Sequence, residues 1–212
     1  MGEIIVIDYG MGNLGSILNM LKKIGARAAL SKEPDDVLNA EKIILPGVGA
    51  FDNAIDKLHS LGYVEALSQK VLLEKTPILG ICLGMQLFGT KSEEGNHRGL
   101  GWLNAETVRF QFQENKLKIP HMGWNEVKIY KESPFFPCGE KETIFYFVHS
   151  YYMHCINSND ILTCTHYGFD FTSAVCHSNI LGVQFHPEKS HRFGLAFFKA
   201  FNVWSPMTLP AD

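Results

Sequence analysis

The chain contains 212 residues, of which 46% are hydrophobic, and its formal net charge at pH 7 is −3. This length suits one large domain or two small ones, and the apolar content can fill a sizeable core. No basic run marks a nucleic-acid-binding surface, no apolar run reaches the ~18 residues of a membrane-spanning helix, and no secretory signal is expected at the N-terminus.

The cysteines are odd in number and show neither metal-ligand spacing nor the paired pattern of a disulfide framework. We therefore expect reduced thiols in a soluble, cytoplasmic protein. The five are Cys82, Cys138, Cys155, Cys164 and Cys176.

The N-terminal region begins with an apolar, β-branched run at 3–8 that predicts the first strand of a parallel sheet. Gly10, Gly12 and Gly15 follow and open a helical pattern, which formally matches a dinucleotide-binding fingerprint, with Glu33 near the ribose-binding distance. A nicotinamide-binding protein is therefore one hypothesis, and a tight turn that needs glycines is the other. The predicted apolar helix face is Leu14, Ile17, Leu18, Leu21 and Ile24.

Two further strands are predicted, over 26–30 and 43–45, and the second leads into the glycine-rich loop Pro46-Gly-Val-Gly-Ala-Phe51. Glycines allow main-chain N–H groups to face an oxyanion, and the carboxyl end of a parallel strand is where active sites of open sheets lie. A plain Gly-Pro loop is the alternative. Helices are predicted over 51–59 and 63–73.

The stretch 77–89 carries the strongest local signal for catalysis. A buried strand ends near Cys82, which Gly80 and Gly84 flank, and a helix is predicted from Leu83 onward. This is the spacing of a strand-to-helix nucleophile elbow, with sulfur as the nucleophile. The N-terminal end of the helix would favour the thiolate. A small cysteine buried behind a strand is the alternative.

After residue 90 the pattern changes to short alternating strands, which predicts an antiparallel or mixed continuation of the same domain. A final amphipathic helix is predicted over 190–203, with Phe193, Ala196, Phe197 and Ala200 inward, and a tail over 204–212. The predicted strands are 106–110, 126–129, 144–148, 151–155, 161–166, 174–177 and 180–185.

A base for Cys82 is predicted at His186, which ends an apolar strand and precedes Pro187 and Glu188. In an extended segment, residues two apart project to the same side, so Glu188 can fix the imidazole tautomer while the other ring nitrogen faces the thiol. A strand-ending turn is the alternative. A metal site of Cys164, His166, His177, His186 and His191 matches no standard zinc motif.

Three motifs in this order, 46–49, 80–86 and 184–189, resemble those of triad-type class I glutamine amidotransferases. The segments 7–14, 120–125 and 146–151 narrow the resemblance to glutaminase subunits of imidazole glycerol phosphate synthases, over about residues 3–203. The resemblance implies an α/β fold of flavodoxin-like, three-layer α/β/α type. Its mixed sheet would have a parallel N-terminal half and antiparallel additions in the C-terminal half, all in one domain over 1–203.

The same resemblance implies hydrolysis of L-glutamine to glutamate and ammonia, with the ammonia passed to a (β/α)₈-barrel cyclase subunit in a heterodimer. It implies no cofactor and no metal, and it turns the 10–15 loop toward the partner. The alternatives are a paralogous glutaminase that supplies another synthase, such as one that modifies a surface-polysaccharide sugar, a non-catalytic binding subunit, and a hydrolase of γ-glutamyl peptides.

Residue roles follow from the resemblance motif by motif. Cys82 is the nucleophile, His186 the general base and acid, and Glu188 the residue that orients it. The implied oxyanion hole comprises Gly47, Val48, Gly49 and Leu83. Glutamine would be bound by Gln86, Ser150 and Tyr151, and the cyclase-facing surface would include Asn13, Trp124, Tyr146 and Lys189.

Overall fold

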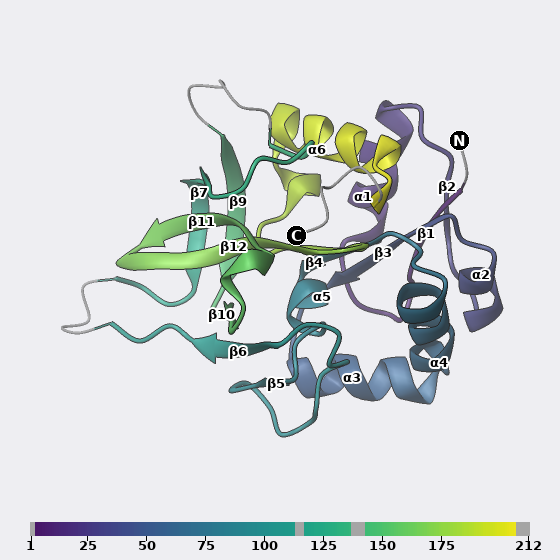
Figure 1. Cartoon of the computed structure of the whole chain (residues 1–212), viewed down its shortest axis with the longest axis horizontal. Coiled ribbons are helices and arrows are strands. Elements are labelled where there is room, and N and C mark those ends of the chain that lie inside the picture. The colour runs from purple at the N-terminus through teal and green to yellow at the C-terminus, as the bar shows by residue number, and fades with distance from the viewer. Residues whose placement is uncertain (1–2, 113–116, 137–142, 207–212) are drawn as a thin grey trace.

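The computed structural model describes residues 3–112, 117–136 and 143–206. A twisted central sheet separates two helical layers (Figure 1). Helices α1 (Leu14–Lys23) and α6 (His191–Val203) cover one face, and α2 (Pro34–Leu38), α3 (Phe51–Ser60) and α4 (Tyr63–Ser68) cover the other. Each face has its own apolar core, so the three-layer α/β/α prediction is confirmed.

The N-terminal half of the sheet is parallel, as predicted. Its inner strands are apolar and buried because helices cover both faces, whereas its edge strand Ala28–Leu30 is only partly buried. Their spatial order is β2, β1, β3, β4 and β13, so the last strand of the described residues lies next to the strand that ends at Cys82. Their bounds are β1 Ile4–Val6, β2 Ala28–Leu30, β3 Lys42–Gly47, β4 Ile78–Cys82 and β13 Ile180–Val183.

Antiparallel strands extend the sheet beyond β13, which confirms the mixed-sheet prediction. A separate antiparallel pair, β7 with β9, lies alongside. The bounds are β5 Lys91–Ser92, β6 Ala105–Arg109, β7 His121–Glu126, β8 Lys128–Ile129, β9 Ile144–His149, β10 Tyr151–Cys155, β11 Ile161–Tyr167 and β12 Phe169–His177.

Several element predictions were wrong in detail. The strand predicted over 174–177 is the end of β12, which begins at Phe169. The strand predicted over 126–129 is the end of β7 followed by the short β8, and β7 itself was not predicted as a strand. The helix predicted over 63–73 is α4 followed by a π-helical turn, η1 (Gln69–Leu73). Helix α2 was not predicted, because one turn begun by Pro34 is too short to show a helical period.

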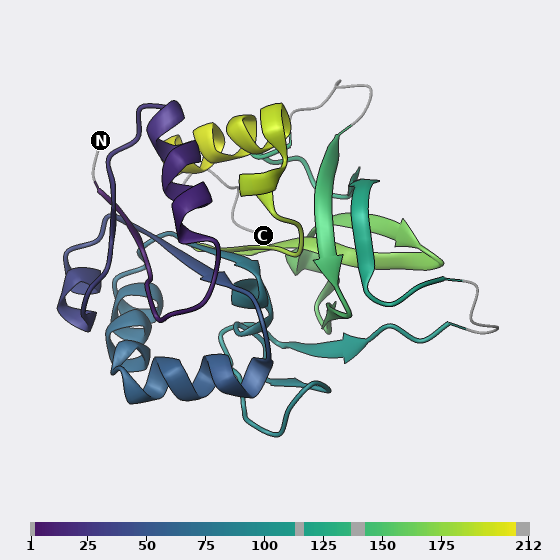
Figure 2. The same ribbon diagram turned by 180° about the vertical axis from the view of Figure 1, so that it is seen from behind.

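The buried face of α6 also differs from the prediction. Gly194, Phe197, Phe198 and Phe201 are buried, whereas Ala196 is exposed. The large rings set the helix rotation because they bury more apolar surface than alanines do. Figure 2 shows α6 beside α1. Trp204, assigned to the tail by sequence, is buried with its ring 5.1 Å from that of Phe135, while 207–212 lie outside the described residues.

Within the described residues, no helix combines the length and the apolar character required to cross a bilayer.

Candidate active site

Cys82 stands at a sharp turn between β4 and the helix α5 (Leu83–Gln86). Its φ of 54° and ψ of −110° are strained for a residue with a side chain, and such strain is typical of a nucleophile elbow. The flanking glycine is sterically required, because a Cβ on Gly84 would overlap the carbonyl oxygen of Leu45. A Cβ on Gly47 would likewise lie 2.8 Å from the Gly84 nitrogen. The predicted sharp turn from strand to helix at Cys82 is therefore confirmed.

The helix after the elbow is shorter than expected. Helix α5 has only four residues, so few peptide dipoles align toward the sulfur. From the sequence we expected the N-terminal end of this helix to favour the thiolate form of Cys82. In the structure, Gln184 Nε2 donates a hydrogen bond of 3.5 Å to Cys82 Sγ. A side-chain amide from the neighbouring strand thus adds the support that a longer helix was expected to give.

His186 follows β13 and is joined to Glu188, as predicted. Its Nδ1 lies 2.8 Å from Glu188 Oε1, and both side chains are buried. The geometry of the link was predicted wrongly, because residues 187–189 form the 3₁₀ turn η4 (Pro187–Lys189) and not an extended segment. The turn is held by Ser190, whose hydroxyl donates to the His186 carbonyl over 2.6 Å.

The surroundings of His186 favour its charged form. Burial lowers the pKa of the ring, but the Cys82 sulfur and the Glu188 carboxylate outweigh it and raise the pKa to about 10. Nε2 of His186, the ring nitrogen that does not bond Glu188, is buried and has no hydrogen-bond partner of good geometry among the described residues. An imidazolium near Cys82 stabilises a thiolate, and the pair can transfer a proton to a leaving group.

Cys82 and His186 both line one cavity of about 320 Å³. Among the predicted site residues, Glu188 supports His186 from behind and Gly47 ends β3 beside Leu83, and neither lines the cavity. The predicted residues that do line it are Cys82, His186, Val48, Gly49, Leu83, Gln86, Ser150 and Tyr151.

The loop after β3 contributes Val48 and Gly49 to the cavity wall. Val48 is 43% exposed and Gly49 has a φ of 103°, a conformation that favours glycine. The start of the loop is fixed by Tyr9, whose hydroxyl donates to the Pro46 carbonyl over 2.8 Å. Tyr9 was not identified from sequence, because nothing in its local pattern places it against a loop 37 residues away.

Two amides connect the far wall of the cavity to the sulfur. Gln86 Nε2 donates to the Tyr151 carbonyl over 3.1 Å and to Gln184 Oε1 over 3.0 Å. A carbonyl can only accept, so this contact fixes the orientation of Gln86, and Gln86 in turn fixes Gln184 with an N–H toward Cys82. Gln184 was missed, although a glutamine inside the apolar run 181–185 was a usable signal.

Sequence reasoning also missed four lining residues, namely Glu94, Pro120, Val148 and His149. Glu94 accepts a hydrogen bond of 3.0 Å from the Phe51 nitrogen at the start of α3. Burial raises the pKa of its carboxyl, the Phe51 N–H opposes this, and Asp52 adds to the rise. The 91–99 loop carries several acidic and polar residues, so sequence alone could not show which one reaches the cavity.

The predicted partner-facing residues form one cluster and one outlier. Trp124 is 47% exposed and packs edge-to-face on Tyr146, with ring centroids 6.2 Å apart, and Lys189 Nζ lies 5.6 Å from the Tyr146 ring centre. The indole also stacks on His191 at 5.4 Å. Asn13 belongs to another element, as the N-cap residue of α1.

The glycine fingerprint of the first loop has a structural explanation. Gly10 and Gly12 have positive φ values of 74° and 108°, as tight turns require. Gly15 has open space where a Cβ would lie, so it lacks the close helix–strand packing of the third glycine in a dinucleotide site. Glu33 is the N-cap residue of α2. These features favour the tight-turn interpretation.

The five residues of the metal hypothesis are not gathered into one site. His166 pairs with Asp170, His177 with Asp160, and His186 with Glu188. Across the described ranges, no group of three or more His, Cys, Asp or Glu side chains could hold a metal ion.

A family model described as glutamine amidotransferase class-I matches residues 5–202. The chain is 49% identical over 198 residues to imidazole glycerol phosphate synthase subunit HisH 2 of Pseudomonas aeruginosa, covering 93% of this chain and 98% of that protein. It is 52% identical over 198 residues to the HisH 2 subunit of Methanococcus maripaludis, with the same coverage.

Solved structures share the fold at lower identity. A structure titled glutamine amidotransferase superposes with a TM-score of 0.72 at 17% identity, covering 94% of this chain and 99% of that chain. The structure of PurLQS from Thermotoga maritima gives a TM-score of 0.71 at 17% identity, covering 95% and 98%.

Proposed function

The chain belongs to the class-I glutamine amidotransferase family, and we propose that it is the glutaminase subunit of an imidazole glycerol phosphate synthase, acting in histidine biosynthesis. Relatives with this name match almost the whole chain at high identity, which favours this function over a paralogue that supplies another synthase. The structural observation that carries the proposal is the cavity shared by Cys82 and His186, with Glu188 bonded behind the imidazole.

The proposed chemistry has two halves. The Cys82 thiolate attacks the side-chain amide carbon of glutamine, and His186 gives its Nε2 proton to the amide nitrogen as the C–N bond breaks and ammonia leaves. The now neutral His186 takes a proton from water, which attacks the thioester. The C–S bond breaks, glutamate is released, and the thiolate–imidazolium pair is restored.

The tetrahedral intermediates carry an oxyanion beside the sulfur. We assign the main-chain N–H of Leu83 and the loop Gly47, Val48 and Gly49 as its donors, because Leu83, Val48 and Gly49 line the cavity next to Cys82. One such donor typically contributes about 3 kcal/mol to the transition state.

The free ends of glutamine need complementary groups. Glu94 brings a carboxylate to the cavity, which suits the α-ammonium group. Both Nε2 hydrogens of Gln86 are used within the protein, so its carbonyl oxygen is the atom left to accept a hydrogen bond from the substrate. Ser150 and Tyr151 complete the wall through their main chain.

The ammonia has an acceptor in a cyclase subunit, which we expect to be a (β/α)₈ barrel and the partner in a heterodimer. The half-exposed Trp124, packed with Tyr146 and Lys189, supports a protein interface here. Asn13, at the start of α1, is assigned to the interface from the family resemblance alone. We propose that residues 1–203 form one catalytic domain. A cytoplasmic location is supported by Cys82, Cys155, Cys164 and Cys176, which are free thiols.

The test is a glutaminase assay with and without purified cyclase subunit. We expect glutamate release to be slow for the isolated chain and strongly stimulated by the cyclase. Absence of stimulation would overturn the subunit assignment, and full activity of the isolated chain would contradict the dependence on docking.

Two companion measurements separate the remaining alternatives. A glutamine-analogue alkylator should give a mass adduct on Cys82, whereas an unmodified Cys82 would favour a non-catalytic binding subunit. Turnover of γ-glutamyl peptides should be far below that of glutamine, and the reverse result would indicate a peptide hydrolase.

A further inference from the structure

A second series of hydrogen bonds ends at the cavity wall, where His149 and Tyr151 lie. His149 Nδ1 lies 2.7 Å from the Tyr151 carbonyl oxygen, and His149 Nε2 lies 2.9 Å from His121 Nδ1. His121 Nε2 lies 3.1 Å from Asn125 Nδ2. The series therefore runs from Asn125 through two imidazoles to the Tyr151 carbonyl, the same oxygen that accepts from Gln86.

The Tyr151 carbonyl determines the donor and the acceptor in each of these hydrogen bonds. The Tyr151 carbonyl only accepts, so His149 must carry its hydrogen on Nδ1 and accept through Nε2 when it is neutral. His121 must then donate from Nδ1 and accept at Nε2 from the amide of Asn125. Both histidines are thus required in the same tautomer, and protonation of either ring would place two donors face to face.

The environment keeps both rings neutral. His149 is 6% exposed and His121 is 3% exposed. Burial lowers the pKa of His149 to about 3 and that of His121 to about 4. The His121 ring is also clamped by stacking on Tyr167, with ring centroids 4.1 Å apart.

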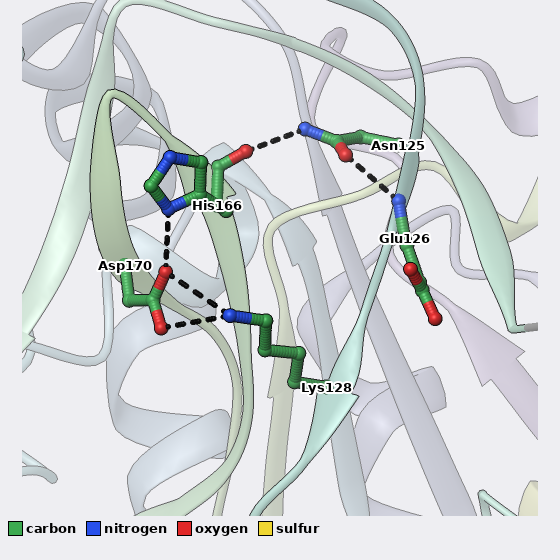
Figure 3. Close-up of polar contacts among 5 residues, drawn as sticks. All are labelled: Asn125, Glu126, Lys128, His166 and Asp170. Atoms are coloured by element: carbon green, nitrogen blue, oxygen red, sulfur yellow. Dashed lines mark hydrogen bonds and ion pairs between the residues drawn. The ribbon is translucent and has the colours of Figure 1, made fainter.

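The outer end of the series is fixed by contacts of its own. Figure 3 shows Asn125 donating to the main-chain oxygen of His166 over 2.9 Å and accepting from the Glu126 nitrogen over 2.8 Å. The His166 ring bonds Asp170, which also pairs with Lys128. All polar atoms of the Asn125 amide are therefore used, and its orientation is determined.

We infer that His149 and His121 are positioning residues for glutamine hydrolysis: they hold the Tyr151 carbonyl so that Gln86 and Gln184 are oriented toward the substrate and the Cys82 sulfur. This inference rests on the proposed function. Two buried histidines could serve packing alone, but a packing role does not require one tautomer. Here that tautomer ends on an oxygen shared with Gln86, which is bonded to Gln184 and through it to Cys82.

The kinetic test compares two substitutions of His121 in the complex with the cyclase subunit. His121→Phe keeps an aromatic ring against Tyr167 but removes both nitrogens, while His121→Asn keeps an N–H near the position of Nδ1. We expect His121→Phe to raise KM for glutamine about tenfold, with a smaller change in kcat, and His121→Asn to restore most of the loss. His154→Phe, an exposed position on β10, is the matched control and should leave both constants unchanged.

The second measurement needs no variant. Nitrogen-15 NMR of the imidazoles at pH 7 should show His149 and His121 neutral with hydrogen on Nδ1. Either ring found charged, or with its hydrogen on Nε2, would overturn the inference, as would an unchanged KM in a folded His121→Phe protein. A wild-type complex that releases no glutamate would refute the proposed function, while the tautomer result would stand independently.

Discussion

Two buried imidazoles line the same cavity, and their pKa values are shifted from the ordinary histidine value in opposite directions. His186 is 2% exposed and its pKa is raised to about 10, despite the opposing effect of burial. His149 is 6% exposed and burial lowers its pKa to about 3. Burial is nearly equal for both, so the difference comes from what each ring contacts. One is near a sulfur and a carboxylate, the other is between a carbonyl and a neutral imidazole.

With the roles proposed above, this contrast separates the residue that exchanges protons from the residue that holds the cavity wall. A ring that must exchange protons is given negative neighbours, which allow it to be charged inside the core. A ring that must hold a carbonyl is given neutral neighbours, which keep its hydrogen on a fixed nitrogen. The amides of Gln86 and Gln184 connect the two, from the carbonyl held by His149 to the sulfur near His186.

The largest effect, on both activity and the pKa of His186, should come from removing the Cys82 sulfur. Cys82→Ala should reduce glutamine hydrolysis on the order of 10⁴-fold or more, because no other group can form the thioester. It should also lower the pKa of His186 by removing a negative neighbour, which NMR titration can measure. Partner binding, measured by calorimetry, should persist. A variant that still releases glutamate would refute the role of Cys82.

The next effect should come from the carboxylate behind His186. Glu188→Gln keeps the size of the side chain but removes its charge, so the tautomer and the charged form of His186 both lose support. We expect kcat to fall about 10²- to 10³-fold with little change in KM. A loss confined to KM would instead assign Glu188 to substrate binding.

The chemistry of this site was far more predictable than its supporting contacts. Local spacing was enough to locate Cys82, and the segment 186–188 placed a carboxylate beside an imidazole within three residues. The same reasoning overestimated α5, because a sequence pattern shows where a helix can begin but not that the chain leaves it after four residues. The elbow angle and the glycine contacts were predicted, since both follow from local sterics.

The polar network was unpredictable for a different reason. Gln184, His149 and Glu94 meet the cavity from three distant segments, and sequence gives no spatial distance between them. Strand β7, which carries His121, was also missed because its residues do not alternate between apolar and polar types. Tertiary pairing with β9 determined its structure.

A smaller effect on glutamine hydrolysis is expected from Gln184, which lies between the Gln86 amide and the Cys82 sulfur. Gln184→Leu removes the N–H that reaches the sulfur and leaves one hydrogen of Gln86 without its partner. We expect kcat/KM for glutamine to fall about tenfold, from the loss of one or two hydrogen bonds. Gln69→Leu, at an exposed position in η1, is the matched control. Equal activities for both variants would show that the hydrogen bonds of Gln184 do not contribute to catalysis.

The smallest effect should be on the free energy of unfolding. It should fall at alkaline pH because of His186 and at acid pH because of His149 and His121; we call these the alkaline limb and the acid limb. His186 has a folded pKa above its ordinary value of 6.5, so its contribution is full below pH 6.5 and is lost as the pH rises toward 10. His149 and His121 have folded pKa values below 6.5, so their contribution is full above pH 6.5 and is lost as the pH falls through 4 and 3. Each tenfold change in proton affinity corresponds to about 1.4 kcal/mol.

Melting temperatures measured across this pH range can separate the two limbs. Glu188→Gln should flatten the alkaline limb and leave the acid limb in place. His149→Phe should reduce the acid limb, leaving the part that comes from His121, and should not change the alkaline limb. If one substitution flattened both limbs, the two rings would titrate as a single unit and the distinction between them would be lost.

The position of β13 has a consequence for biosynthesis of the protein. It is the last strand of the described chain, yet it pairs with β4 on one side and β12 on the other. A nascent chain on the ribosome therefore has an open slot in its sheet until residue 183 has emerged. His186, which we propose as the base for Cys82, follows three residues later, so on this proposal an incomplete chain cannot consume glutamine before its sheet can close.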